Sequence, residues 1–283
     1  MPQQSTGRYD DATLRHLQLV ELKILEDLDR VCAQHGIEYF LDSGSALGAL
    51  RHGGFIPWDD DVDVGMLRPD YDRFLQIAVD ALGPEYYVSD PVGNPRQSAL
   101  FTKIWLVDTK FHTDETLRAG ISQGIGVDVF CYEPLSADEA VAAKQIKGCR
   151  FWQSAMYLYH SASVAVPHGG ALGLLERAAC RIAHAVLRIA FSHDSLLRRF
   201  EAWAAAGGGN PGECWFCPPY SNFGRFPEDV LTPPVRRGFE GVELPVPAQP
   251  EKYLEIMFGD WRQLPPEDQR HQHRPTHLDF GRY

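Results

Sequence analysis

The chain has 283 residues, 44% apolar and 23% charged, which is enough material for one large hydrophobic core or two smaller ones. Lysine and arginine number 27 against 38 aspartates and glutamates, giving a formal net charge of −11. This charge argues against nonspecific attraction to nucleic acid or to an anionic membrane, so a polyanionic substrate would need metal ions or local basic residues.

The first half of the chain is predicted to mix helices and strands. Asp11 can cap a long helix whose apolar positions from Leu14 to Val31 form a stripe, and this helix should end before Gly36. The next elements, in chain order, are a strand at 37–41, a short helix at 45–51, a loop, a strand at 61–66, a helix at 69–81 and strands at 98–107 and 125–130.

The second half is predicted to be helical at first and rich in proline afterwards. Helices are expected at 138–159, 171–191 and 193–206, followed by a glycine-rich break at 207–211 and one helix near 253–258. We therefore predict an α+β fold in three parts. These are a catalytic core over 1–135, a helical region over 136–210 and a C-terminal segment over 211–283 that packs back on the core.

The predicted helix at 171–191 carries a broad apolar stripe that includes Leu172, Leu175, Ile182 and Ile189. We expect the stripe to pack in the core, and contact with a membrane or a lipid-linked acceptor is the less favoured alternative. Polar residues and a glycine pair interrupt the charge-free run at 151–175. No stable membrane insertion is therefore expected.

The six cysteines are scattered along the chain and do not resemble the dense disulfide framework of a small secreted domain. The first 15 residues lack the apolar stretch of a signal peptide. A reducing, cytoplasmic location is the expectation. Cys214 and Cys217 form a single C-x-x-C, and zinc binding there stays open because spacing identifies no further ligands.

Four aspartates, Asp59, Asp60, Asp61 and Asp63, stand within five consecutive positions. Like charges this close are costly without a counter-charge. Alternate residues of a strand face the same side, so Asp61 and Asp63 can converge on one ligand. Carboxylate oxygens suit Mg²⁺ or Mn²⁺, and we predict a metal site held by these two, with Asp59 as a further candidate ligand.

Two other readings of the aspartate cluster are open. An acidic surface turn is the common alternative for any isolated D-x-D. A calcium loop would use Asp59, Asp61 and Asp63, with Asp70 closing it. However, Val64 stands where that loop requires glycine, and the flanking segments are predicted as loop and strand rather than two helices.

Two further segments favour the metal site. Gly44 and Ser45 open a short helix after a predicted strand and offer backbone N–H groups and a hydroxyl to an anion. Asp128 is a single acid within the apolar strand GVDVF, where burial is costly unless the acid binds a metal or a partner. We predict Asp128 as the third carboxylate, although an acid at a strand edge that faces water is also compatible.

The segment DSGSALGALRHGGFIPWDDDVDVGM at 42–66 resembles the core motif of the LicD family, which also includes the fukutin-related proteins. Similar segments recur at TKIW, GIGVDVF, FEGVELPVP and YLEIMFGDWRQLPP, so the resemblance spans nearly the whole chain. It implies a nucleotidyltransferase-like fold of the polymerase β palm type. It also implies that Gly44, Ser45, Asp61, Asp63 and Asp128 supply the family's Gly-Ser step, D-x-D and later acid.

Two departures from the superfamily pattern involve no metal ligand. Ser43 stands where an apolar residue usually precedes the Gly-Ser step, and the loop to Asp61 is long. Lys103 and Arg51 lie in family-like segments and are predicted to bind substrate phosphate, with His52 a weaker candidate. The basic tail residues Arg270, His271, His273 and Arg274 could close over the donor phosphate or form a solvated chain end.

The resemblance implies transfer of a phospho-alcohol, such as phosphocholine or ribitol phosphate, from a CDP-linked donor to a sugar or similar hydroxyl, with Mg²⁺ or Mn²⁺ as cofactor and no nucleic acid partner. The alternative is transfer of a nucleoside monophosphate from an NTP to a small molecule or protein. A catalytically silent nucleotide-binding module is the third hypothesis. Release of CMP rather than pyrophosphate would separate the first two.

Overall fold

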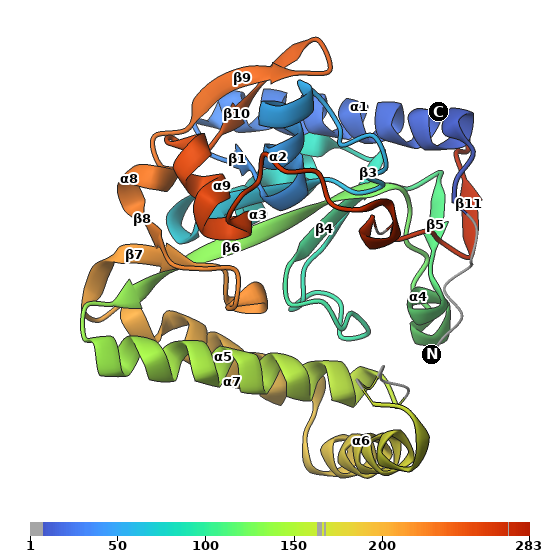
Figure 1. The fold of residues 1–283 in the computed structure, drawn as a ribbon, viewed down its shortest axis with the longest axis vertical. Helices are drawn as coiled ribbons and strands as arrows, with labels where there is room; N and C mark the ends of the chain where they lie inside the picture. Colours follow the sequence, from blue (N-terminus) through green and yellow to red (C-terminus); the bar gives the residue numbers. More distant parts are fainter. Residues whose placement is uncertain (1–7, 163–165, 167, 271) are drawn as a thin grey trace.

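The computed structural model describes residues 8–162, 166, 168–270 and 272–283. The α-helices are α1 Asp11–His35, α2 Ser43–His52, α3 Arg68–Leu82, α4 Asp114–Ala119, α5 Glu139–His160, α6 Gly170–Ala190, α7 His193–Ala204, α8 Glu228–Leu231 and α9 Pro250–Phe258 (Figure 1). The strands are β1 Phe40–Leu41, β2 Asp63–Leu67, β3 Tyr86–Ser89, β4 Thr102–Leu106, β5 Lys110–His112, β6 Gly126–Ser136, β7 Pro211–Phe216, β8 Phe226–Pro227, β9 Val235–Phe239, β10 Val242–Val246 and β11 His277–Asp279.

A seven-stranded mixed sheet forms the centre of the fold. Its main path runs β1-β2-β6-β4-β3, and β7 and β8 extend the sheet from the far half of β6. β2 and β6 are parallel, whereas their other neighbours in the sheet are antiparallel. Two-stranded sheets join β9 to β10 and β5 to β11. The α+β class with a mixed sheet is therefore confirmed.

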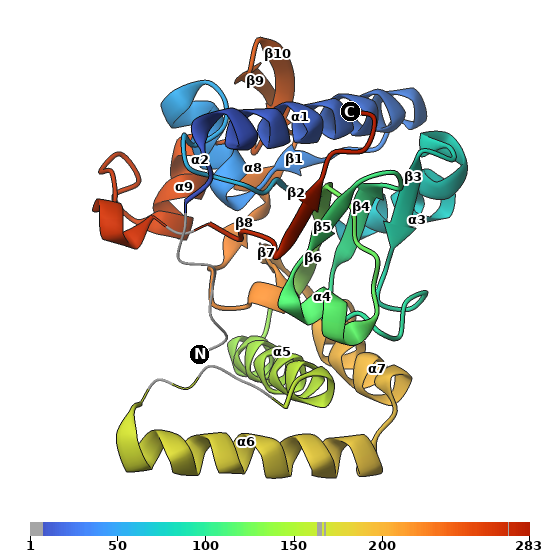
Figure 2. The ribbon, with the colours of Figure 1, turned by 90° about the vertical axis from the view of Figure 1, so that its right-hand side faces the viewer.

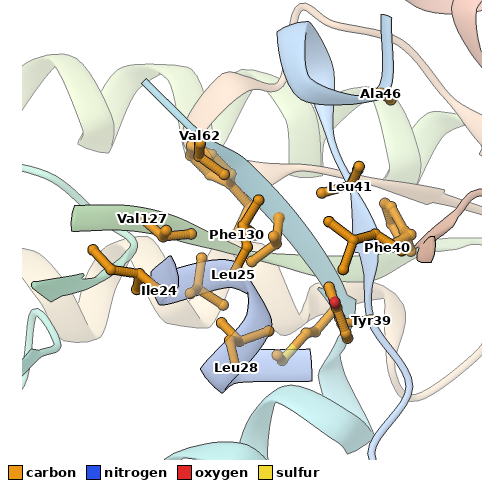
Figure 3. Close-up of a cluster of buried hydrophobic side chains, with 14 of the residues drawn as sticks. Ile24, Leu25, Leu28, Tyr39, Phe40, Leu41, Ala46, Val62, Val127 and Phe130 are labelled. Carbon is orange, nitrogen blue, oxygen red and sulfur yellow. The ribbon is translucent and has the colours of Figure 1, made fainter. Parts of the chain in front are cut away.

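Helix α1 packs its apolar stripe against the sheet. Ile24, Leu25 and Leu28 have no exposed surface, and Figure 3 shows Ile24 and Leu25 beside Val127 of β6. The predicted helix is confirmed, but its N-cap is Asp10 rather than Asp11, because Asp10 Oδ1 accepts the N–H of Thr13 at 2.9 Å.

The helical region has an apolar cluster of its own. Met156 of α5 and Leu196 and Phe200 of α7 pack together with Leu135, which belongs to the last part of β6. Strand β6 thus joins the main core to the helical region. All three predicted helices are present within two residues of their expected ends. The division of the chain into three parts stays a prediction.

Several strands differ from their predicted bounds. β1 is reduced to two residues, β2 begins at Asp63 instead of 61, β4 begins at Thr102, and β6 continues to Ser136. The proline-rich segment forms the β9–β10 hairpin, whose Phe239 lies in the main core. Hydrophobic periodicity gave no indication of these C-terminal strands because prolines interrupt it.

The prediction that α6 packs in the core is wrong. Gly173 is its only buried residue, whereas Leu175 is 69% exposed and Ile189 88% exposed. Figure 2 shows α6 across one end of the molecule, with the rest of the fold on one side of it. The stripe predicted a helix correctly, but no other element in the described part of the chain covers it. Within the residues that the structure describes, no helix is long and apolar enough to cross a membrane.

Candidate active site

Two acids face each other where the parallel strands β2 and β6 begin. Asp63 pairs with Asp128 in the strand register, and the N–H of Asp128 donates to the carbonyl of Val62 at 2.9 Å. Both side chains are partly exposed at this end of the sheet. Parallel strands start at the same sheet edge, so the fold brings together two acids that are 65 positions apart in sequence.

The first turn of α2 lies beside these acids. Ser45 Oγ accepts the N–H of Asp63 at 2.9 Å, which leaves the hydroxyl proton of Ser45 available as a donor. A Cβ on Gly44 would lie 2.9 Å from Asp59 Oδ2. Gly44 therefore allows the helix N-terminus to approach the acidic loop closely, and first-turn N–H groups have no acceptor within a helix.

Asp42 anchors this helix and was not predicted. Its buried carboxylate accepts the N–H of Ser43 at 2.7 Å and the hydroxyl protons of Tyr132 and Tyr253. Burial nevertheless holds the pKa of Asp42 above its ordinary value. Asp42 is thus the N-cap that fixes α2, and Tyr253 ties this turn to the C-terminal helix α9.

The acids just before β2 contact the C-terminal tail. The N–H of His273 donates to Asp60 Oδ1 at 2.7 Å, and its Nδ1 lies 3.1 Å from Asp61 Oδ2. These two carboxylates raise the pKa of His273 to about 11. Asp61 was predicted to lie within the strand, but β2 begins at Asp63, and Asp61 lies in the preceding loop, where it contacts the tail.

Arg270 of the tail packs on the same loop, and Arg274 packs on the segment before α1. Arg270 stacks on Trp58, with its guanidinium carbon 4.3 Å from the ring centre, and Arg274 lies 5.5 Å from the ring centre of Tyr9. His271 lies outside the described residues. The basic tail therefore covers the acidic loop, which is compatible with the predicted closure.

The two predicted phosphate-binding cations have protein partners. Lys103 Nζ lies 2.6 and 2.7 Å from the two carboxylate oxygens of Asp128. Lys103 of β4 lies directly opposite Asp128 of β6 in the antiparallel register. Arg51 donates to the carbonyl of Trp261 at 2.9 Å and interacts electrostatically with Asp59, and its Nε also donates to the ring of His52 at 3.0 Å.

Mutual repulsion and burial perturb the carboxylates of this site. Burial raises the pKa values of Asp59, Asp63 and Asp128, and the charge of Asp61 raises each of them further, although Lys103 opposes the increase at Asp128. The pKa of Asp61 is also subject to burial, yet its hydrogen bond with His273 lowers it overall. The cluster therefore holds more carboxylates than Lys103 and His273, which pair with Asp128 and Asp61, can neutralise.

Glu21 of α1 is a further acid that was not predicted. It is 2% exposed, and burial followed by the charges of Asp61 and Asp60 raises its pKa well above the ordinary value. One turn earlier, Gln18 donates to the carbonyl of Asp59 at 3.0 Å, so the acidic loop lies over this face of α1. The sequence did carry an indication that this face of α1 is polar, because Gln18 and Glu21 interrupt the apolar stripe between Leu14 and Leu25.

The residues present fit a divalent cation. Asp60, Asp61 and His273 each offer a ligand atom, and these atoms lie within 4.8 Å of one another. Asp60 Oδ2 and Glu21 Oε2 are buried and have no hydrogen-bond partner in the described part of the chain, which is costly for carboxylates. Carboxylate oxygens are the donors that Mg²⁺ and Mn²⁺ prefer.

This group of possible ligands differs from the predicted set of Asp61, Asp63 and Asp128. In the predicted set, Asp63 and Asp128 lie on strands β2 and β6. Cys214 and Cys217 belong to no such group among the described residues. Sequence reasoning noted Asp60 and His273 but did not assign them to the metal. Their proximity depends on a contact between residues 213 positions apart.

Comparison with known proteins gives a family for part of the chain. Residues 36–115 match the LicD/FKTN/FKRP nucleotidyltransferase domain. A stretch of 65 residues, 23% of the chain, is 51% identical to the lipopolysaccharide cholinephosphotransferase LicD of Haemophilus influenzae and covers 24% of that protein. A stretch of 42 residues, 15% of the chain, is 57% identical to human ribitol 5-phosphate transferase FKRP and covers 8% of it.

A third relative is an uncharacterized protein of Rickettsia typhi, 39% identical over 70 residues, which are 25% of this chain and 22% of that protein. The matches thus cover about a quarter or less of each relative. The matched segment contains Gly44, Ser45, the acidic loop and Lys103, whereas Asp128 and His273 lie beyond it. Residues 36–115 are thus similar to the LicD/FKTN/FKRP nucleotidyltransferase domain, as the motif at 42–66 predicted.

Proposed function

We propose that this protein is a metal-dependent transferase that moves a phospho-alcohol, such as phosphocholine, from a CDP-linked donor to the hydroxyl of a sugar or similar acceptor. The observation that carries the proposal is the meeting of Asp63 and Asp128 at the start of two parallel strands, beside Asp61 and the first turn of α2. We propose that this arrangement corresponds to a polymerase β palm-type site.

The relatives support the kind of group transferred. Their names describe one as a cholinephosphotransferase and another as a ribitol 5-phosphate transferase. Both names describe transfer of an alcohol that carries phosphate, and the family model that covers such proteins matches the segment that holds the acidic loop. Because they match only short stretches, we infer the donor and acceptor of this chain from chemistry as well as from similarity.

In this proposal Asp61, Asp63 and Asp128 hold Mg²⁺ or Mn²⁺, with Asp59 as a further ligand. The neighbouring Asp60 extends the set of donors, and His273 would join it on losing the proton that Asp60 and Asp61 stabilise. When bound, the cations would neutralise the donor diphosphate and the charge that develops on the departing CMP. Without them the net negative charge of the site would repel a diphosphate.

The chain's own residues bind and orient the substrates. The N–H groups of the first turn of α2 and the Ser45 hydroxyl face the same region as the acids and suit a phosphate oxygen. Lys103 bonds Asp128 and would hold that carboxylate in place to accept a proton from the attacking hydroxyl. The tail around His273 covers the acidic loop and would limit the entry of water.

The alternative is transfer of a nucleoside monophosphate from an NTP with release of pyrophosphate. The same carboxylates serve both reactions, so the products decide between them. The full chain would be incubated with CDP-choline, CDP-ribitol, CTP, ATP or UTP in Mg²⁺, Mn²⁺ or EDTA. CMP and pyrophosphate would each be quantified.

We expect metal-dependent CMP release from a CDP-linked donor, with slow hydrolysis even when no acceptor is present. Asp63→Asn should lose this activity, whereas Asp80→Asn, which changes an exposed acid on α3, should retain it. Faster pyrophosphate release from an NTP would replace the proposal with nucleotidyl transfer. Nucleotide binding without any turnover would indicate a silent module.

A further inference from the structure

Helix α6 packs on the fold by one narrow face only. His184 Nδ1 donates to the carbonyl of Leu158 in α5 at 2.7 Å, and Gly173, Cys180 and Leu187 are less exposed than their neighbours and share this side. α6 lies across one end of the molecule, so its other face points away from the fold (Figure 2).

The outward face of α6 is apolar along its whole length. Five of its side chains are between 52% and 88% exposed, namely Leu172, Leu175, Ile182, Val186 and Ile189. They recur at spacings of three, seven, four and three residues, which keeps them on one side of an α-helix. Such a continuous apolar surface is unusual on a soluble monomer and marks an interaction site.

The charges on α6 are positive. The helix carries Arg177, Arg181 and Arg188 but only one acid, Glu176, whose Oε1 lies 2.6 Å from His168 Nδ1. The three arginines fall along one edge of the helix, between its packed and its outward faces. This edge is basic in a chain whose net charge is −11.

We propose that α6 docks this protein on the surface of a membrane that contains anionic lipids, with the helix lying flat in the interface. An apolar face bordered by arginines, on a helix that does not span the bilayer, has the features of interfacial helices. Arginine side chains can extend along the apolar face and place their guanidinium groups at the lipid phosphates.

Charge selects the membrane over a second copy of the chain. A second copy packed through this face would bring no free acid of its own α6 to the arginine edge, because the single acid of α6 already pairs with His168. The acidic charge elsewhere in the chain does not prevent docking, because charges separated by more than about 8 Å are largely screened at physiological salt. This inference is independent of the proposed transferase activity.

The test is flotation of the full chain with vesicles made of equal parts phosphatidylcholine and phosphatidylglycerol, or of phosphatidylcholine alone. We expect the wild-type chain to float with the anionic vesicles. The triple variant Leu175→Ser, Ile182→Ser, Ile189→Ser should bind about tenfold more weakly or worse, because binding scales with buried apolar area. The matched control Val79→Ser, Val92→Ser changes side chains that are 66% and 69% exposed elsewhere and should bind like the wild type.

A second variant tests the basic edge. Arg177→Gln with Arg181→Gln should weaken binding to anionic vesicles by about fivefold for each arginine removed, whereas Arg237→Gln on the β9–β10 hairpin should not. Circular dichroism would show that each variant is folded. Wild-type chain that floats with neither vesicle, or a triple variant that floats like wild type, would overturn the proposal. Light scattering that shows a dimer lost in the triple variant, without vesicle binding, would assign the face to self-association.

Discussion

The acidic site and helix α6 depart from ordinary burial in opposite ways. At the site, Glu21 and Asp60 are 2% and 1% exposed, and each has a carboxylate oxygen without a hydrogen-bond partner in the described residues. On α6, Ile189 is an apolar side chain that is 88% exposed. Buried charge and exposed apolar surface are both costly in an isolated protein.

The two costs indicate two different partners. Buried carboxylates are stabilised by a cation, whereas an exposed apolar face is stabilised by removal from water. Substitutions should therefore have different consequences for activity and stability at the acidic site, in the hydrophobic core and on α6.

The largest effect is expected from the acids of the strand edge. Asp61→Asn and Asp63→Asn should each lower metal-dependent CMP release by about 100- to 1,000-fold, because a neutral amide is a poorer ligand and no longer offsets cation charge. The melting temperature of Asp63→Asn in EDTA should be unchanged or higher, since the pKa of Asp63 is raised and its repulsion with the other acids is relieved. Normal activity in either variant, or a large loss of stability in Asp63→Asn, would contradict the assigned role.

The next effect contrasts α1 with α6. Leu25→Ala removes a side chain with no exposed surface and should lower the free energy of unfolding by about 2–5 kcal/mol. Ile189→Ala removes an equally large side chain from α6 and should change it by less than about 0.5 kcal/mol. Urea denaturation measures both. A large loss from Ile189→Ala would show that α6 is covered in solution.

Glu21→Gln should affect stability and metal binding in opposite directions. Its pKa is raised in the folded chain, so the native state binds more protons than the unfolded state and stability in EDTA falls as pH rises above the ordinary carboxyl pKa. The variant should flatten this decline and weaken Mn²⁺ binding about fivefold, by loss of about 1 kcal/mol of attraction. Calorimetry and melting curves would measure both, with exposed Glu26→Gln as control. An unchanged pH dependence and Mn²⁺ affinity would exclude Glu21 from the site.

The smallest effect concerns the end of α5. Burial, together with nearby His193 and Arg188, lowers the pKa of His160 to about 4. Between pH 6.5 and this value, His160 is protonated in the unfolded state but not in the native state. The free energy of unfolding therefore falls as the pH falls. Because His160 is partly exposed, we expect a loss of only about 1 kcal/mol between neutral pH and pH 5. His160→Gln should reduce this dependence in urea titrations, and an equal dependence would refute the cause.

Local patterns in the sequence were sufficient for the longer helices and the mixed α and β content, but they did not indicate the short helices α4 and α8. They failed where contacts between residues far apart in the sequence determine the local structure. Asp61 contacts His273 of the tail, and Asp42 is held by Tyr253, a residue 211 positions away. Periodicity identified the apolar stripe of α6 but carried no information about what covers it. Gln18 and Glu21 gave a readable signal within the stripe of α1.

The central claim is that these acids bind a divalent cation and that the cation then binds a CDP-linked donor. The direct measurement is the melting temperature of the full chain with CDP-choline or CDP-ribitol in Mn²⁺ and in EDTA. A bound donor at about a hundred times its dissociation constant adds roughly 2.7 kcal/mol to stability. We predict this stabilisation in Mn²⁺ only, a smaller one with CMP, and none in Asp63→Asn. Equal stabilisation in EDTA would contradict the claim.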